Sequence, residues 1–268
     1  MSPRNHRTQR ITTIAALTGL VLTLPAAKNG CGSLESNDTL LSPVQAVTTV
    51  LEHDDGTVTA ELVLISTSVN PHQFVDSAAD VTLRIPGGDE IELSLSESGH
   101  YTADSQTQPQ LVYTPGETYQ YSFDLDDEAA AEQVTGGNFT GVVDAPADQV
   151  SFTLAEPPEF AGDVARLEWS PTSRYGLIRI FHMDTETTTY SNFDFDEPQF
   201  DGSKWARLTK GGAKELSVDA FPESGNYLVS FCAVDAVRDF DTNLSAELGA
   251  LSGFLIGRCA EDLQVAVQ

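Results

Sequence analysis

Short runs of alternating apolar and polar residues fill the chain after residue 43, and no long window repeats with the 3.6-residue period of a helix. Val44–Glu52 and Val58–Ser66 flank the turn-forming residues His53 to Gly56, which is a hairpin signal. Only residues 126–133 are typical of a short helix or an acidic loop. The first half is therefore expected to form one β-sandwich from the strands Val44–Glu52, Val58–Ser66, Val81–Ile85, Glu90–Leu95, Thr118–Leu125, Phe139–Val143 and Val150–Leu154.

A proline-containing linker, Ala155-Glu156-Pro157-Pro158-Glu159, divides this pattern in two. Proline cannot donate to a strand ladder and stiffens the chain. The sequence predicts an all-β chain of two tandem antiparallel sandwiches, with domains at 44–155 and 162–268 and a linker at 156–161. The strands expected after the linker are Val164–Trp169, Gly176–His182, Thr187–Asn192, Trp205–Leu208, Glu215–Ala220, Tyr227–Asp235, Leu251–Ile256 and Leu263–Val267.

The second half carries two motifs of a known family. Leu167-Glu168-Trp169-Ser170-Pro171 resembles the first strands of a fibronectin type III domain, in which an apolar–x–Trp–x–Pro pattern places the indole in the core. Gly225-Asn226-Tyr227, followed by alternating apolar residues, is similar to a later strand of the same family. The resemblance implies a fibronectin type III-like sandwich, but no activity, because this fold hosts many functions.

The first half also carries short motifs of glycine and tyrosine that resemble those of known families. Ser98-Gly99-His100-Tyr101 and the segment from Tyr113 to Tyr119 resemble the G-x-Y and P-G-x-x-Y patterns of immunoglobulin-like and carboxypeptidase-regulatory-like bacterial modules. The resemblance implies that Tyr119 or Tyr121 is a corner tyrosine whose hydroxyl bonds to the backbone. That function is structural, so both halves are expected to be Ig-like or FnIII-like β-sandwiches.

The N-terminus has the pattern of a secretory signal. Arg4, Arg7 and Arg10 precede the apolar run from Ile11 to Ala27, and no acidic residue lies among them. The run is shorter than the roughly 20 apolar residues that a membrane span needs. We therefore expect a segment that is cleaved after export and not a stable transmembrane anchor.

Cys31 follows this segment immediately after Gly30. The order resembles the signal of bacterial lipoproteins, which implies a signal peptide at 1–30, a lipid such as palmitate on Cys31, and a flexible tether at 31–43. Cleavage near Ala26, which would release a secreted or periplasmic protein, is the alternative, and an uncleaved anchor is a third.

The chain has only two further cysteines, Cys232 and Cys259. If Cys31 carries a lipid, the remaining even pair can form a disulfide in an oxidising compartment. Such a bridge would add roughly 3 kcal/mol of stability by restricting the unfolded chain. Two separate buried thiols are the alternative.

The strongly acidic composition limits which classes of partner the protein can bind. The net charge is −26, and removing residues 1–31, which hold four of the 14 basic residues and no acid, leaves 10 basic against 40 acidic residues, a net −30. Such a surface repels phosphate backbones and anionic headgroups, so nucleic acid is excluded and only a covalent lipid would hold the protein at a membrane. The charge is consistent with adaptation to salty water or with binding of divalent cations.

Two acidic segments are the candidate metal sites. Asp194 and Asp196 lie in one, and Asp239 and Asp241 lie in the other. Oxygen ligands at alternate positions suit Ca²⁺, although neither segment follows the EF-hand spacing. Calcium is thus the one candidate cofactor, and a solvated acidic loop is the alternative interpretation.

Catalytic motifs are missing from the sequence. The histidines His53, His72, His100 and His182 have no metal-ligand spacing, and no nucleophile elbow, phosphate-binding loop or dinucleotide fingerprint occurs. The chain is therefore expected not to be an enzyme. Aromatic residues around the first acidic segment could bind sugars or fill the core: Tyr190, Phe193, Phe195, Phe200 and Trp205.

These observations predict a non-enzymatic lipoprotein of the cell envelope, anchored in the outer membrane by its lipid, that acts as a binding, adhesion or assembly module. Its expected partner is an envelope or extracellular protein. A calcium-dependent adhesion or carbohydrate-binding module is the alternative function. A secreted hydrolase is the third class, and it would require a concave pocket with carboxyl groups of raised pKa.

Overall fold

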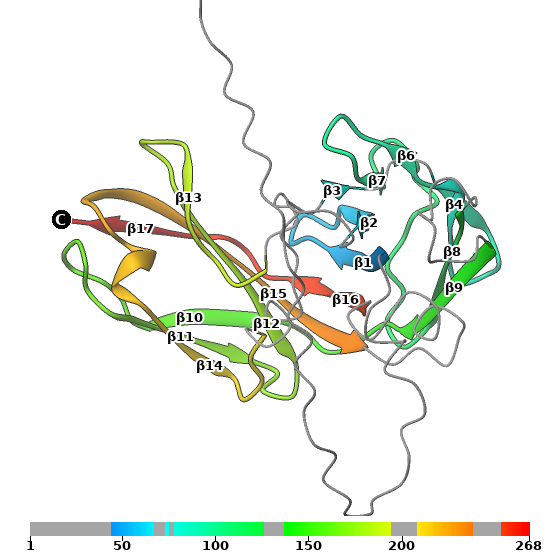
Figure 1. The fold of residues 1–268 in the computed structure, drawn as a ribbon. Helices are drawn as coiled ribbons and strands as arrows, with labels where there is room; N and C mark the ends of the chain where they lie inside the picture. The colour runs from blue at the N-terminus through cyan, green and yellow to red at the C-terminus, as the bar shows by residue number, and fades with distance from the viewer. Residues whose placement is uncertain (1–43, 67–72, 75–77, 126–136, 194–207, 238–252) are drawn as a thin grey trace, which may run out of the picture. The chain divides into compact units, whose positions relative to one another are not determined.

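The computed structural model describes residues 44–66, 73–74, 78–125, 137–193, 208–237 and 253–268 (Figure 1). These residues form three β-sheets, of ten, four and three strands. The prediction of an all-β chain is confirmed. No helix within these ranges has the length and hydrophobicity that a membrane span requires.

The first sandwich packs the four-stranded sheet against part of the ten-stranded sheet. The four-stranded sheet has the order β5 (Glu90–Glu92), β4 (Ala79–Arg84), β8 (Thr118–Leu125) and β9 (Gly137–Asp144). Opposite lie β1 (Val44–Glu52), β2 (Val58–Ser66) and β7 (Tyr101–Asp104). The alternation in β8 buries Tyr119, Tyr121 and Phe123 on one face, as its aromatic pattern predicts.

The second sandwich packs the three-stranded sheet against the other part of the ten-stranded sheet. The three-stranded sheet consists of β10 (Ser151–Glu156), β11 (Ala165–Ser170) and β14 (Ala213–Leu216). It faces β12 (Tyr175–His182), β15 (Gly225–Val237) and β17 (Leu263–Val267). Trp169 is buried there with its ring centroid 5.3 Å from that of Phe231. The core position predicted for this indole is confirmed.

The ten-stranded sheet runs through both sandwiches in the order β13 (Thr187–Ser191), β12, β15, β16 (Gly253–Cys259), β1, β2, β7 and β6 (Ser94–Leu95), with β17 paired to β15 and β3 (Gln73–Phe74) paired to β2. The strand β16 joins the two halves, since it pairs antiparallel with β15 and parallel with β1. Phe254 and Ile256 of β16 pack in the core of the first sandwich. One sheet therefore belongs to both cores.

Strand assignments near the expected linker need correction. Val150–Leu154 was expected to close the first sandwich, but β10 pairs with β11, and its apolar side chains pack against the second core. Conversely, β16, expected in the second half, contributes to the first core. The limits at 44–155, 156–161 and 162–268 stay a prediction about domains, while the cores themselves exchange strands across them.

Two further expected strands end differently in the structure. Glu90–Leu95 divides at Leu93 into β5 and β6, which belong to different sheets, because the chain crosses between layers there. The run Glu215–Ala220 gives only the end of β14, and a 3₁₀ turn, Val218–Ala220, follows it. Most of the expected strand Trp205–Leu208 and the helix or loop at 126–133 lie outside the described residues.

Candidate functional site

Four buried tyrosines have hydroxyl groups of raised pKa, and all four have a structural role. Burial raises the pKa of Tyr113, Tyr119, Tyr121 and Tyr227. The Tyr119 hydroxyl donates to the Val112 carbonyl oxygen at 2.7 Å, which confirms one of the two predicted corner tyrosines. The Tyr121 hydroxyl instead crosses the first core to the Thr49 carbonyl oxygen at 2.7 Å. These hydroxyls bind backbone groups, so their role is structural.

Cys232 and Cys259 form a disulfide across directly opposed positions of β15 and β16, with an S–S distance of 2.06 Å. The structure therefore supports the predicted pairing over two separate thiols. The bond lies beside the point where β16 passes from one sandwich to the other. It links the joining strand to the longest strand of the second sandwich.

The centre of the ten-stranded sheet is buried on both faces. Side chains that point away from the two sandwich cores form a third apolar cluster. Val47 and Val63 come from the first half, Val234 from β15 and Leu255 from β16. Phe193, one of the aromatic residues considered for sugar binding, is buried in this cluster, so its role is packing.

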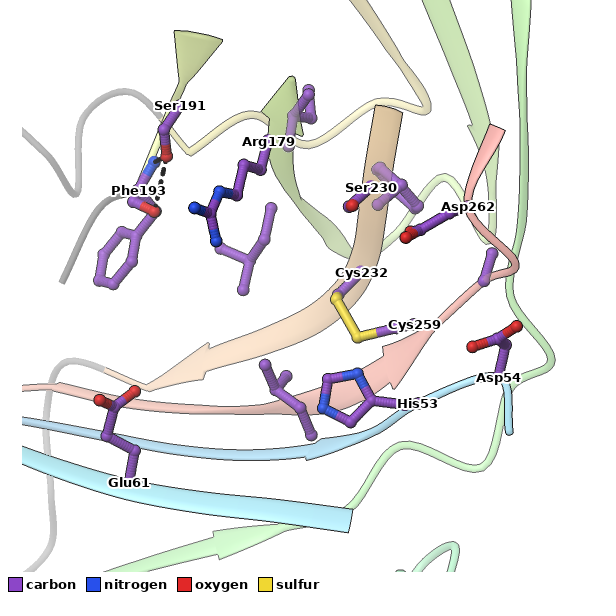
Figure 2. Close-up of a pocket in the computed structure, with 15 residues that line it drawn as sticks. His53, Asp54, Glu61, Arg179, Ser191, Phe193, Ser230, Cys232, Cys259 and Asp262 are labelled. Carbon is purple, nitrogen blue, oxygen red and sulfur yellow. Dashed lines mark hydrogen bonds between the residues drawn. A yellow bond between two sulfur atoms is a disulfide. The ribbon is translucent and has the colours of Figure 1, made fainter. Parts of the chain in front are cut away.

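A cavity of about 470 Å³ opens on this same face of the sheet, beside the disulfide (Figure 2). Its walls come from β12, β15, the ends of β1, β13 and β16, the turn after β1, Glu61 of β2 and the segment between β16 and β17. Cavities that hold small molecules have volumes of about 300–1,000 Å³, apolar walls and a few polar groups. The apolar walls include Leu51, Leu177 and Phe193, and polar groups flank them.

Arg179 supplies the positive charge of the cavity. It lies on β12, where strand alternation turns its side chain away from the second core. Its Nε and Nη2 donate to the Thr188 hydroxyl oxygen at 3.2 and 3.1 Å, respectively. Of the five N–H donors of the guanidinium group, three have no protein acceptor within the described ranges.

The other described arginines each have a carboxylate partner. Arg84 pairs with Glu90, Arg166 with Glu168, Arg174 with Asp148 and Asp235, and Arg258 with Glu52. In a chain of net charge −26, the absence of a carboxylate beside Arg179 among the described residues distinguishes it from all of these. Its remaining donors are available to an acceptor that enters the cavity.

Three carboxylates line the cavity, and two of them, Asp54 and Asp262, lie on the opposite side of the disulfide from Arg179 (Figure 2). The third, Glu61 of β2, lies on the Arg179 side in this view and contacts His100 Nδ1. Asp54 comes from the turn after β1, and Asp262 precedes β17. His53 lies below the disulfide in this view, with its Nε2 3.0 Å from the Thr59 hydroxyl oxygen. The cavity therefore presents Arg179 at one side and Asp54 and Asp262 at the other, while Glu61 is engaged by His100.

Most of the remaining candidate residues lie outside the part of the chain that the structure describes. Cys31, Asp194, Asp196, Asp239 and Asp241 lie outside the described residues, so the predicted lipid attachment and calcium ligands stay predictions. Within the ranges that the structure describes, no three His, Cys, Asp or Glu side chains are placed to hold a metal ion. His72, Phe195, Phe200 and Trp205 are likewise outside.

The described histidines are separate. His100 and His182 are buried, and His100 Nδ1 lies beside Glu61 on β2. His182 packs against Tyr227 with 4.5 Å between ring centroids, and its Nδ1 accepts a hydrogen bond from the Thr185 N–H. Both histidines therefore contact residues of the fold and are assigned a structural role.

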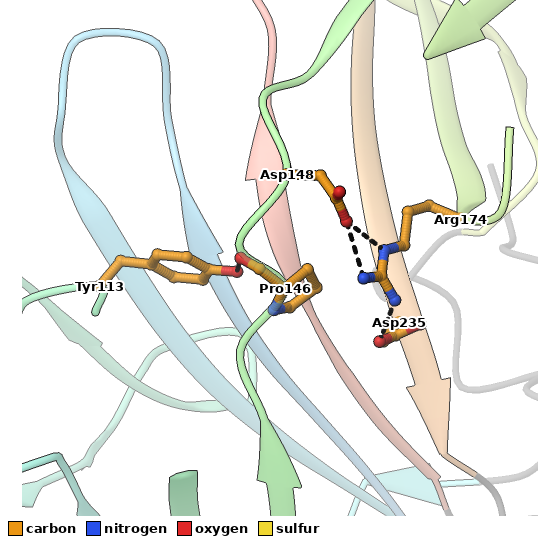
Figure 3. A network of polar contacts seen from close by, with 5 residues as sticks. All are labelled: Tyr113, Pro146, Asp148, Arg174 and Asp235. Carbon is orange, nitrogen blue, oxygen red and sulfur yellow. Dashed lines mark hydrogen bonds and ion pairs between the residues drawn. The ribbon is translucent and has the colours of Figure 1, made fainter. Parts of the chain in front are cut away.

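A polar network fixes the chain between the sandwiches (Figure 3). Arg174 donates from Nε and Nη2 to Asp148, in the connection from β9 to β10, at 3.0 and 2.7 Å, and from Nη1 to Asp235 on β15. The Tyr113 hydroxyl donates to the Pro146 carbonyl oxygen in the same connection at 2.9 Å. These contacts hold the connection against both cores.

Sequence reasoning missed Arg179 and the cavity. A lone arginine on an alternating strand has no local signature, and the cavity depends on strands that are far apart in the chain. One signal for the sheet was available: Phe254-Leu255-Ile256 is a continuous apolar run, which is typical of a strand that is buried on both faces.

No family model matches the chain, and no curated protein matches it in sequence. Among solved structures, the FN1–FN3 domains of chicken CNTN1 are similar at 9% identity, with 85% of this chain and 69% of that chain covered and a TM-score of 0.21. Native alpha-2-macroglobulin from Escherichia coli, spanning domains MG0-NIE-MG1, is similar at 8% identity, with 86% and 99% covered and a TM-score of 0.25. Such low values carry no argument about function.

Proposed function

We propose that the protein is a non-enzymatic binding module of the bacterial cell envelope, held at the outer membrane by a lipid on Cys31. The basic and apolar N-terminal segment that ends at Cys31 supports the anchor. The acidic composition supports a covalent attachment, because a surface of this charge is repelled by anionic headgroups.

The cavity beside the disulfide is the observation that carries the binding role. Its apolar walls suit an apolar body, Arg179 suits a carboxylate, and Asp54 and Asp262 suit an ammonium group. A ligand with both charges has no net charge, so the negative field of the chain does not repel it as it would repel a simple anion. We infer that the cavity binds a small apolar zwitterion, such as a short peptide.

Calorimetric titration with leucyl-leucine tests this function. The intact dipeptide is expected to bind, N-acetyl-leucyl-leucine to lose the contribution of its ammonium group, and leucyl-leucine amide to lose that of its carboxylate. Arg179→Gln should raise the dissociation constant of the dipeptide about tenfold, which is equivalent to the roughly 1.4 kcal/mol of one charge-assisted hydrogen bond.

Arg84→Gln is the matched control, because Arg84 is an exposed arginine that pairs with Glu90 away from the cavity. It should leave the dissociation constant unchanged. Equal binding of all three dipeptides, or no difference between wild type and Arg179→Gln, contradicts the assignment of the cavity.

Labelling with a palmitate analogue in the native host tests the anchor. The wild-type chain should carry the label and sediment with the outer membrane, whereas Cys31→Ser should carry no label and appear in the soluble fraction. Recovery of an unmodified Cys31 in an intact N-terminus contradicts the anchor and leaves the cavity assignment untouched.

A further inference from the structure

The strand β17 has one edge that no strand covers within the described part of the chain. It pairs with β15 along one side only, and its other side faces a groove of about 650 Å³. The far wall of the groove is made by Leu154 of β10 and by the segment Pro157 to Phe160. This groove is separate from the cavity beside the disulfide, with which it shares no lining residue.

Backbone hydrogen bonds fix which groups point into the groove. The Gln268 N–H donates to the Glu159 carbonyl oxygen at 2.9 Å, and the Gln268 carbonyl oxygen accepts from the Ala161 N–H at 3.0 Å. Alternate residues of a strand direct their N–H and C=O groups to the same edge. Gln264 and Ala266 therefore direct theirs to the side of Gln268, and these four groups have no protein partner among the described residues.

The groove is open because the linker leaves β17. Both bonds of Gln268 match a parallel pairing opposite Phe160, and continuing it would bring the Glu159 N–H to the Ala266 carbonyl oxygen. The Asp163 carboxylate accepts from that N–H at 3.1 Å instead. Upstream, Pro157 and Pro158 have no N–H to donate, and β10 joins the other sheet.

The lining of the groove indicates which kind of chain fits it. Phe160 and Leu263 are 56% and 36% exposed, although both are large apolar residues. Glu159 lies in the lining, which contains no lysine or arginine. Two further exposed acidic residues, Glu156 and Asp262, directly adjoin lining residues in the sequence. An added strand would bond to the free edge, place alternate apolar side chains in the groove, and gain from basic side chains outside it.

We propose that this groove binds an extended, basic segment of a partner polypeptide, which adds to β17 as a further strand. The segment bonds to the N–H and C=O groups of Gln264 and Ala266, and its apolar side chains cover Phe160 and Leu263. This interaction is independent of the small-molecule function of the cavity.

Fluorescence anisotropy with a labelled, blocked peptide of sequence Lys-Val-Lys-Val-Lys-Val-Lys tests the proposal on the full chain. The peptide should bind, and an analogue with N-methyl groups on alternate residues, of the same charge, should bind at least tenfold more weakly. Since charge is identical, that difference isolates the strand hydrogen bonds from simple attraction to an acidic surface. Equal binding of the two peptides overturns the proposal.

Gln264→Pro removes an N–H that points into the groove and no donor of the β15 ladder, so its folding should be retained. Gln264→Pro should weaken binding of the peptide at least tenfold, whereas Gln264→Thr, which keeps the N–H, should leave the binding unchanged. If Gln264→Pro fails to fold, the two peptides on the wild-type chain decide the question. A dimer in sedimentation that Gln264→Pro abolishes would assign the edge to a second copy of the chain and overturn the peptide proposal.

Discussion

Replacing Arg174 with methionine removes the guanidinium group that ties the connection between the sandwiches to β15. The aliphatic part of the side chain is kept, but Asp148 and Asp235 lose their shared cation. Both carboxylates then lie close together in a chain that already has a net charge of −26. The variant is therefore expected to be less stable, and the loss should be larger than for an ordinary surface ion pair.

The exposure of the three side chains sets the magnitude. Arg174 is 22% exposed, Asp235 33% and Asp148 44%, so the group is neither buried nor fully solvated. Hydrogen bonds to charged groups contribute about 1.5–3 kcal/mol when protected, and exposed ion pairs contribute about 0–1 kcal/mol. Between these limits, the expected loss is about 2 kcal/mol, which lowers the Tm by about 4–8 °C for a chain of this size.

Urea denaturation and thermal melts at low salt measure this loss. Arg84→Met is the matched control, because Arg84 and Glu90 are 54% and 52% exposed and their pair should contribute less than about 0.5 kcal/mol. High salt should reduce the difference between the two variants, since screening weakens the contribution of Arg174. If the Tm of Arg174→Met lies within 1 °C, roughly 0.3 kcal/mol, of that of Arg84→Met, the network does not stabilise the junction.

Three further predictions concern the fold. Gly257→Ala should cost about 3 kcal/mol or more in urea denaturation, because its Cβ would lie 2.1 Å from a carbonyl oxygen of β15, whereas Gly116→Ala, with nothing within 4 Å, should cost about 1 kcal/mol. Tyr121→Phe should cost about 1 kcal/mol by removing the hydroxyl that joins β8 to β1, and an unchanged urea midpoint would contradict that role. The hydrogen bond from the Asn226 N–H lowers the pKa of Asp184 from its ordinary value, so the stabilisation that this carboxylate contributes is present above the ordinary aspartate pKa and is lost as the pH falls through the lowered one. Asp184→Asn should therefore show a smaller drop in Tm between pH 5 and pH 3 than wild type.

Local alternation was enough to predict many of the strands. The expected bounds of Val44–Glu52, Val58–Ser66, Thr118–Leu125 and Leu263–Val267 agree with β1, β2, β8 and β17. Each has a clear turn signal beside it and a regular apolar face, which are properties of a few neighbouring residues. The core position of Trp169 followed from a motif of similar length.

Partners that are distant in sequence could not be predicted in the same way. The parallel pairing of β16 with β1 joins residues about 200 positions apart, and no local pattern in Leu251–Ile256 specifies it. The sheet change at Leu93 and the packing of β10 in the second core also depend on tertiary contacts. The cavity could not be predicted for the same reason, because Asp54, Arg179 and Asp262 line one cavity only once the shared sheet has formed.

The side-chain Nε–H resonance of Arg179 tests the central claim, that the cavity beside the disulfide binds a zwitterion, most directly. In ¹⁵N-labelled protein titrated with leucyl-leucine, this signal is expected to shift with the same saturation as the backbone amides of Asp54 and Asp262, and leucyl-leucine amide should move the Asp54 and Asp262 amides but not Arg179. Saturating shifts that leave all three residues unchanged, and appear elsewhere on the chain, would contradict the account.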